Sequence, residues 1–305
     1  MERASGHTAG GRRPGRARIA GAWFTPYLFI APFLLFFCAI FLGPAIYSLY
    51  LSFTRYRGFG TPRWVGLDNY AVILNYHTFW LLLRNSVFYW IAHSIPMMLI
   101  AFLLAILVHS KLAPWLKLFK AVIFLPQMLA TVAAALLFQN FFGTRYGVLD
   151  SLLGIEIPWL TSQSLAPWTV VAMLIWRDTG YWFIIFLAGL TTINPDIDDA
   201  ARIDGASELQ RLLRITIPLM RPTFVFAFLV DAIVTLRLFA EPNVLAGKSG
   251  ALAPDFVAPV LNLIVQNIRG GQFGLAAAIG WLLFVLIAAI SFVMFRVMRE
   301  RNTVQ

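Results

Sequence analysis

Charged residues are scarce in this chain of 305 residues, because Asp, Glu, Lys and Arg make up only 12% of it. A soluble domain usually carries about 25% of these residues. Hydrophobic residues account for 60% of the chain, and so few charges cannot form the solvated surface that an apolar core of this size needs in water. A soluble globular protein is therefore excluded, and we expect the excess apolar surface to face lipid.

Cysteine is nearly absent, which excludes proteins that are stabilised by internal disulfides or that bind a metal through a cysteine cluster. Cys38 is alone, so no internal disulfide can form, and no Cys-x-x-Cys or Cys/His cluster is present to hold a metal. The phosphate-binding glycine loop that ends in Gly-Lys-Ser/Thr is also missing. We therefore expect no metal site, no catalytic residue and no cofactor held by this chain.

Basic residues outnumber acidic ones, with a net charge of +10, but they lie in short clusters between long apolar runs. This distribution is typical of the cytoplasmic face of a membrane protein and argues against nucleic-acid binding. Residues 1–18 are rich in Gly and Arg and are predicted to be a disordered, basic cytoplasmic tail. The charge-free run from Ile19 to Thr54 is far longer than the ~7–15 apolar residues of a signal peptide, so we expect a retained first membrane helix.

Six apolar segments are long enough to cross a bilayer, which takes about 20 residues of helix. We therefore predict an all-α integral membrane protein whose membrane domain covers residues 19–301. The six predicted spans are Tyr27–Phe53, Asn85–Val108, Lys120–Phe142, Trp168–Leu190, Pro222–Leu245 and Phe273–Phe295.

The basic residues predict the orientation of these spans. With the N-terminus inside, the cytoplasmic segments hold fifteen Lys and Arg residues, the outside loops hold seven, and two more lie within spans. Cytoplasmic loops of membrane proteins carry the excess of Lys and Arg. The count therefore favours both termini in the cytoplasm, although three of the seven outside residues crowd the first outside loop, at Arg55, Arg57 and Arg63.

The cytoplasmic loop 191–221, between the fourth and fifth spans, encodes two short helices. Asn194 can cap the first helix, and Pro195 suits its first position. Gly205 supplies a left-handed residue that stops it. Ser207 can cap the second helix, with Gln210 three residues later completing a capping box. The pattern predicts a compact helix–turn–helix on the cytoplasmic surface.

Two further features of this loop concern its contacts and its end. Ala200 and Ala201 are small, so they would let the surface of a partner approach the backbone of the first helix closely. Pro218 and Pro222 are expected to limit the second helix before the fifth span begins. A loop of this kind is suited to docking against a soluble partner.

The loop resembles the EAA loop of permease subunits from bacterial ATP-binding-cassette (ABC) importers. The family pattern is an acid and two alanines, then three residues, a glycine, nine residues and Ile-x-Leu-Pro. This chain has Asp199-Ala200-Ala201, then Gly205, then Ile215-Thr-Ile-Pro218, so both spacings are met, with Asp in place of Glu and Ile in place of Leu. The tract from Ile203 to Ala206 is similar to the carbohydrate-uptake branch, as are the stretches Trp64–Tyr70 and Phe186–Leu190.

The resemblance implies a type I ABC importer permease fold in the bacterial cell membrane. Its partners would be a second permease subunit, usually a different homologous chain, two ABC ATPases that bind ATP and magnesium, and an extracytoplasmic solute-binding protein. The chain would translocate a sugar or oligosaccharide and would not itself be an enzyme. The residues that the resemblance assigns to ATPase coupling are Asp199, Ala200, Ala201, Asp204, Gly205, Ile215 and Pro218.

Four charges fall near the middle of predicted spans, where each costs at least about 2.5–3.5 kcal/mol on insertion scales. Arg177 and Asp178 lie in the fourth span, and Asp231 and Arg237 lie in the fifth. Neither pair shares a helix face, so cross-helix pairing or a water-filled path is expected. One interpretation is a solute pathway, and the other is an ion pair that locks the two spans. The candidate pathway residues are Gln139, Asn140, Trp176, Arg177, Asp178, Asp231 and Arg237.

Histidines are interpreted as ordinary packing or surface residues, including His77, His93 and His109.

Three other functions remain to be weighed. The same importer could carry glycerol phosphate or another sugar-like anion, for which an arginine in the pathway would be useful. An ion-driven secondary transporter would usually need internal inverted repeats and would not explain the loop. A membrane-embedded enzyme would need paired catalytic groups in the spans.

Overall fold

The computed structural model describes residues 25–109, 116–143, 147–247 and 251–299. The predicted tail, residues 1–18, lies outside this part of the chain. The structure divides into two units, one that runs to Tyr50 and one that begins at Leu51. We describe each unit by itself.

The first unit is a single apolar helix with a widened turn. It comprises α1 (Thr25–Phe37), the π-helical turn η1 (Cys38–Leu42) and the start of α2 (Gly43–Ser52). The N–H of Gly43 bonds to the carbonyl of Cys38, and Pro44 follows directly. Proline has no N–H and its ring collides with the carbonyl four residues earlier, so a wider turn lets the helix continue past it. Residues from Tyr27 to Ser52 are long and apolar enough to cross a membrane, which confirms the first predicted span.

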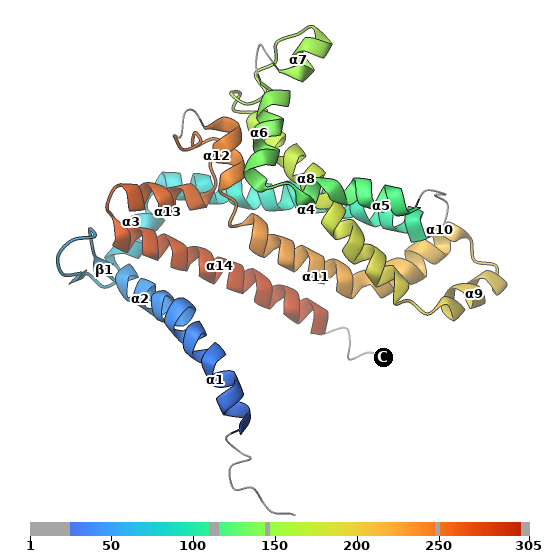
Figure 1. The fold of residues 1–305 in the computed structure, drawn as a ribbon, viewed down its shortest axis with the longest axis horizontal. Coiled ribbons are helices and arrows are strands. Elements are labelled where there is room, and N and C mark those ends of the chain that lie inside the picture. Colours follow the sequence, from blue (N-terminus) through green and yellow to red (C-terminus); the bar gives the residue numbers. More distant parts are fainter. Residues whose placement is uncertain (1–24, 110–115, 144–146, 248–250, 300–305) are drawn as a thin grey trace, which may run out of the picture. The chain divides into compact units, whose positions relative to one another are not determined.

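The second unit is almost wholly helical (Figure 1). Its one sheet in the described residues is a short antiparallel pair, β1 (Thr54–Arg55) and β2 (Arg63–Trp64), in which Thr54 faces Trp64. The helices are α3 (Asp68–Leu74), α4 (His77–His109), α5 (Leu116–Phe124), η2 (Leu125–Met128), α6 (Thr131–Phe141), α7 (Val148–Leu153), α8 (Ala166–Thr191), α9 (Pro195–Ile203), α10 (Glu208–Arg211), η3 (Leu212–Thr216), α11 (Ile217–Thr235), α12 (Ala240–Ala246), α13 (Val260–Arg269) and α14 (Phe273–Arg299).

The described residues contain five helices that could cross a membrane by themselves, and six if one bent pair counts as a span. The bent pair is the predicted third span, 120–142, which is therefore not one straight helix. It turns by 95° between Met128 and Thr131. Pro126 interrupts the helical hydrogen bonds at this point, and η2 tightens into a 3₁₀ turn before the extended residue Leu129.

Close backbone packing fixes the place of this bend. Gly180 of α8 lies against the chain where α5 passes into η2. A Cβ atom built on Gly180 would lie 2.2 Å from the carbonyl oxygen of Ile123 and 2.8 Å from Cα of Phe124. Glycine is thus required here because any side chain would push the two helices apart.

The predicted fifth span, 222–245, is wrong at both ends. The helix begins earlier, because α10, η3 and α11 form one continuous helix from Glu208 to Thr235 that qualifies as a span. It also ends earlier, and the short helix α12 follows after a break. Pro218 does not stop the helix, since the π turn η3 precedes it and the N–H of Ile217 bonds to the carbonyl of Leu212.

Two apolar cores fill the second unit. One core includes Tyr89, Leu174 and Leu236, and the other includes Met97 and Phe183. Along α4 and α8, the residues of one core give way to those of the other near the middle of the helix, and along α11 they do so nearer its C-terminal end, between Ala227 and Ala232. Buried polar side chains occupy these crossover points and are described below.

Candidate functional site

The loop between α8 and α11 has the two-helix structure that its sequence predicts. The side chain of Asn194 accepts a hydrogen bond from the N–H of Asp196 and caps α9. Gly205 has a φ of 79°, the left-handed conformation that L side chains rarely adopt. Ser207 and Gln210 form both bonds of the predicted capping box at the start of α10. These local predictions are confirmed.

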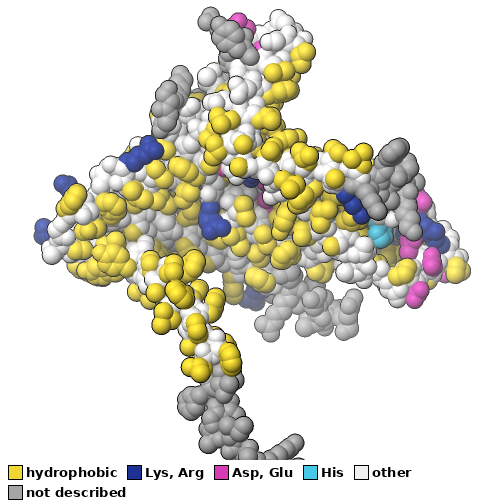
Figure 2. Space-filling model, viewed as in Figure 1, with side chains coloured by type: hydrophobic (Ala, Val, Ile, Leu, Met, Phe, Trp, Pro, Cys, Tyr) yellow, Lys and Arg dark blue, Asp and Glu magenta, His cyan; other side chains and the backbone are white. Residues whose placement is uncertain are grey.

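One ion pair holds the two short helices together, and a second lies within α9. Arg211 of α10 is largely buried, and its Nη1 donates to Oδ1 of Asp198 on α9 at 2.5 Å. Arg202 Nε lies 3.4 Å from Oδ2 of the same carboxylate. Figure 2 shows acidic and basic side chains gathered at the α9–α10 end, while hydrophobic side chains dominate the rest of the visible face. The loop is therefore a folded knob, and we call residues 194–211 the coupling knob.

The residues assigned to coupling do not all face outward. Asp199, Ala200, Asp204 and Gly205 are exposed, but Ala201 is only 9% exposed, and its carbonyl accepts from the N–H of Ala206. The expectation that Ala201 presents a small surface to a partner is therefore wrong, because this residue packs inside the knob.

The outer surface of the knob also carries large apolar side chains. Ile203 is 87% exposed and Leu209 is 64% exposed. These two side chains add apolar area to the charged surface of the knob. The other two coupling residues, Ile215 and Pro218, lie beyond the knob, in η3 and α11.

A buried polar cluster joins three long helices and α12. Nη1 of Arg177 on α8 donates to Oε1 of Glu241 on α12 at 2.7 Å, and its Nε donates to Oδ1 of Asp178 at 2.7 Å. His93 of α4 has one ring nitrogen 3.5 Å from Oδ2 of Asp178 and the other 3.4 Å from Oδ2 of Asp231 on α11. Within the described ranges, no group of three or more His, Cys, Asp or Glu residues has a geometry that could hold a metal.

Burial explains why these charges are paired. His93 is fully buried, Asp231 is 3% exposed, and the hydroxyl of Ser94 donates to the Asp231 carboxylate. An unpaired charge in such surroundings is costly, whereas a paired and hydrogen-bonded one is tolerated. The hydrogen bond from Ser94 to Asp231 thus links α4 to α11, and the pair of Arg177 with Glu241 links α8 to α12. His93 of α4 lies close to the carboxylates of both Asp178 and Asp231.

The structure corrects the sequence analysis of these residues. Arg177 and Asp178 were expected to point apart, yet their side chains meet directly. His93 was interpreted as an ordinary packing or surface residue, but it lies between the carboxylates of Asp178 and Asp231, and neither ring nitrogen has a hydrogen-bond partner among the described residues. Glu241 was not singled out. The available signals were a histidine in the interior of an apolar span and an acid next to Pro242 near the end of another.

The remaining pathway candidates lie outside the cluster. Arg237 is exposed in the turn after α11, and its Nε donates to the carbonyl of Ile233 on that helix, so it does not pair with Asp231. Gln139 donates to the carbonyl of Val244 at 2.9 Å, which ties α6 to α12. Asn140 is exposed on α6.

Trp176 completes the set of pathway candidates. It is 37% exposed, and its ring centroid lies 5.2 Å from that of Phe138. The seven candidates therefore separate into three that belong to the buried cluster and four that lie outside it.

Apolar helices of membrane-spanning length, with a folded knob between α8 and α11, define a class, the multi-spanning membrane protein. Residues 70–300 match the family model for the binding-protein-dependent transport system inner membrane component. The chain belongs to this family.

Individual relatives agree with this assignment. The chain is 32% identical over 275 residues to the arabinooligosaccharides transport system permease protein AraP of Bacillus subtilis (strain 168), covering 88% of this chain and 86% of the relative. It is 31% identical over 285 residues to the lactose transport system permease protein LacF of Rhizobium radiobacter, covering 90% and 94%. A solved bacterial ABC transporter involved in the import of the acidic polysaccharide alginate has the same fold, with a TM-score of 0.78 and 22% identity over 92% of this chain and 96% of that chain.

Proposed function

We propose that this chain is the membrane-spanning subunit of an ABC importer that carries a sugar or oligosaccharide across the cell membrane. An extracytoplasmic binding protein would deliver the solute, and two partner ATPases would hydrolyse ATP. The observation that carries the proposal is the coupling knob, which stands on a continuous helix, Glu208–Thr235, in a chain of the binding-protein-dependent transport family. The named sugar permeases AraP and LacF support the solute class.

The continuous helix gives a mechanism for coupling. A movement of the knob, pressed by an ATPase, would be carried along the helix to Asp231, which lies on α11 and contacts α4 through His93. At 1.5 Å per residue, the 23 residues from Glu208 to Asp231 span about 35 Å. The buried cluster would then transmit the movement to α4 and α8 during the change between inward-open and outward-open states.

The four candidates outside the cluster would line the solute path. Gln139, Asn140 and Trp176 would offer amides and an aromatic face, which suit the hydroxyl groups and apolar patches of a sugar ring. Arg237 is the one observation that favours the second candidate, a glycerol-phosphate-like anion, because an exposed guanidinium binds phosphate well. A second permease subunit would complete this path.

Two glycines offer a matched test of the coupling knob. Gly205 and Gly154 both have positive φ, 79° and 67°, and for both the space that a Cβ would fill is open. A valine at either position costs roughly 1–2 kcal/mol in local backbone energy. We expect Gly205→Val and Gly154→Val to reach the membrane at equal levels. Only Gly205→Val should lose ATPase co-purification and solute-stimulated ATP hydrolysis, and Ala200→Arg should behave like it. Normal coupling in both knob variants would refute the docking role.

The proposed orientation puts the knob inside and the β1–β2 loop outside. Ile203 and Phe59 are 87% and 93% exposed, so cysteines at these positions should be accessible to labels. In a Cys38→Ser background, an impermeant maleimide should label Phe59→Cys in intact cells. It should label Ile203→Cys only after the membrane is opened. The reverse pattern would invert the topology.

A further inference from the structure

A second candidate binding site lies at the end of the long helices opposite the coupling knob. The C-terminal end of α4, at His109, lines a pocket with knob residues, whereas its first residue, His77, follows α3 closely in the chain. The 33 residues of α4 span about 50 Å. In Figure 1, α3 and α13 lie at one end of these helices and α9 and α10 at the other. Under the proposed function, the α3–α13 end is the face at which the solute arrives.

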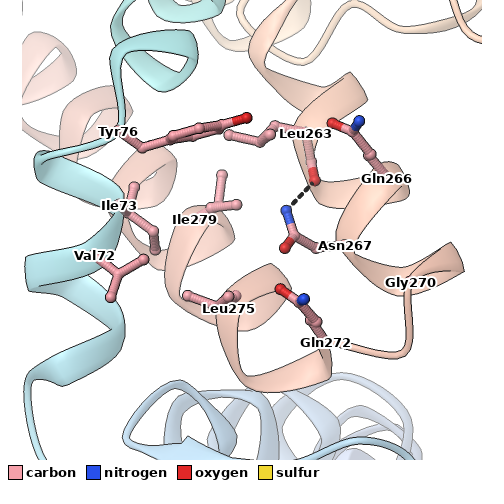
Figure 3. Close-up of a pocket in the computed structure, with 10 residues that line it drawn as sticks. All are labelled: Val72, Ile73, Tyr76, Leu263, Gln266, Asn267, Gly270, Gln272, Leu275 and Ile279. Carbon is pink, nitrogen blue, oxygen red and sulfur yellow. Dashed lines mark hydrogen bonds between the residues drawn. The ribbon is translucent and has the colours of Figure 1, made fainter.

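A pocket of about 420 Å³ opens at this end between α3, α13 and the start of α14 (Figure 3). Pockets for small molecules usually measure about 300–1,000 Å³. The residues that line it are Val72, Ile73, Tyr76, Leu263, Gln266, Asn267, Gly270, Gln272, Leu275 and Ile279. They come from segments almost 200 positions apart in the chain, so the pocket is a product of the tertiary fold.

The lining is neutral and combines amides with an apolar wall. Gln266, Asn267 and Gln272 supply three amide groups, and no charged side chain lines the pocket. Each amide offers both donors and acceptors. Asn267 Nδ2 donates to the carbonyl of Leu263 at 2.7 Å, which fixes this side chain. In Figure 3, Ile73 and Tyr76 face the amide-bearing side across the pocket.

A smaller pocket of about 160 Å³ adjoins the first. The two share Val72, Gln272 and Leu275 in their linings. The smaller one adds Arg55 and Arg57 of the β1 region and Asp68 and Asn69 of α3. The two arginines belong to the group that crowds the first outside loop, against the usual distribution of positive charge.

We propose that the larger pocket is a saccharide subsite on the extracytoplasmic face, which holds one neutral ring of an oligosaccharide before it enters the membrane path. This inference rests on the proposed function. A sugar ring presents hydroxyl groups at its edge, which match the three amides, and C–H patches on its faces, which match Ile73 and Tyr76. A lipid chain would be better served by a wholly apolar lining, and a charged protein side chain by an opposite charge. Neither kind of lining is present in the larger pocket.

A cysteine reporter tests the subsite without altering its amides. Val72 lines the pocket and is 56% exposed, so Val72→Cys in a Cys38→Ser background should react with a maleimide. The complete importer complex in lipid nanodiscs would be labelled with and without arabinotriose, lactose or maltotriose. We expect every sugar that stimulates ATP hydrolysis of the complex to slow labelling severalfold. Gln266→Leu with Gln272→Leu should abolish this protection, whereas Gln163→Leu, an exposed amide outside the pocket, should leave it unchanged.

Each other outcome has a defined meaning. A sugar that stimulates ATP hydrolysis but does not slow labelling would overturn the subsite and leave the proposed function standing. Protection by the binding protein without sugar would make the pocket a protein docking surface, and slow labelling in nanodiscs but not in detergent would make it a lipid site; both overturn the inference. If none of the sugars stimulates ATP hydrolysis, the proposed sugar class fails and the subsite fails with it.

Discussion

The coupling knob and the buried polar cluster are both built from charged residues, but over different distances in the chain. In the knob, Asp198 and Arg211 are 13 positions apart, and the Asp198 side chain is 45% exposed. In the cluster, Arg177 and Glu241 are 64 positions apart, and Ser94 and Asp231 are 137 apart, all of them buried. The knob can therefore form from its own sequence, whereas the cluster exists only after α4, α8, α11 and α12 have packed.

The largest expected effect is the loss of a partner inside the cluster. Arg177→Leu would leave Glu241 and Asp178 without their guanidinium, and breaking a buried ion pair costs about 3–5 kcal/mol. We expect this loss in the free energy of unfolding, measured by SDS titration of the protein in detergent micelles. If the double variant Arg177→Leu with Glu241→Leu were no more stable than the single one, Glu241 would not be the partner that matters.

A smaller effect is expected in the knob. Asn194→Ala removes the side-chain oxygen that caps α9, at a cost of about 0.5–2 kcal/mol. Since the knob is formed by short-range contacts, the loss should stay local. Hydrogen exchange should become faster for the amides of α9 but not for those of α4 or α8. Faster exchange in the long helices would show that the knob and the spans unfold as one unit, so that the knob would not form independently of them.

The smallest effect on stability is expected at Arg237. This arginine is exposed and pairs with no carboxylate among the described residues, so Arg237→Gln should change the free energy of unfolding by no more than about 0.5 kcal/mol. Uptake should nevertheless fall if Arg237 lines the solute path. Unchanged uptake and unchanged stability together would remove Arg237 from the pathway.

The separation in sequence between contacting residues also decides how much of the structure could be predicted from the sequence. The caps at Asn194 and Ser207 and the left-handed Gly205 depend on neighbours within a few positions, and all three predictions are confirmed. Hydropathy likewise located the helical spans, because bilayer thickness constrains each one separately. Family resemblance added the docking role of the knob, which remains a proposal.

The sequence could not name partners that lie far apart in the chain. Cross-helix partners were expected for the buried charges, but the pairing of Arg177 with Glu241 and the bridging position of His93 depend on how four helices are rotated. The broken third span was missed for a related reason. A proline in an apolar run does not indicate by itself whether a helix bends, and here Pro126 coincides with a 95° turn.

The π turn η3 has a consequence for the direction in which the knob faces. An α-helix advances by about 100° per residue, so the extra residue of a π turn shifts the angular phase of everything beyond it by that amount. The turn Leu212–Thr216 thus sets the rotation of the knob about the helix axis relative to Asp231. Inserting or deleting one residue in this turn would make the knob face a different side of the molecule, while the knob and the rest of α11 keep their own structures. The first unit has the same device, with Cys38–Leu42 ahead of Pro44 as η3 is ahead of Pro218. In two of the spans, therefore, a π turn just before a proline sets how far the helix beyond the turn is rotated relative to the helix before it.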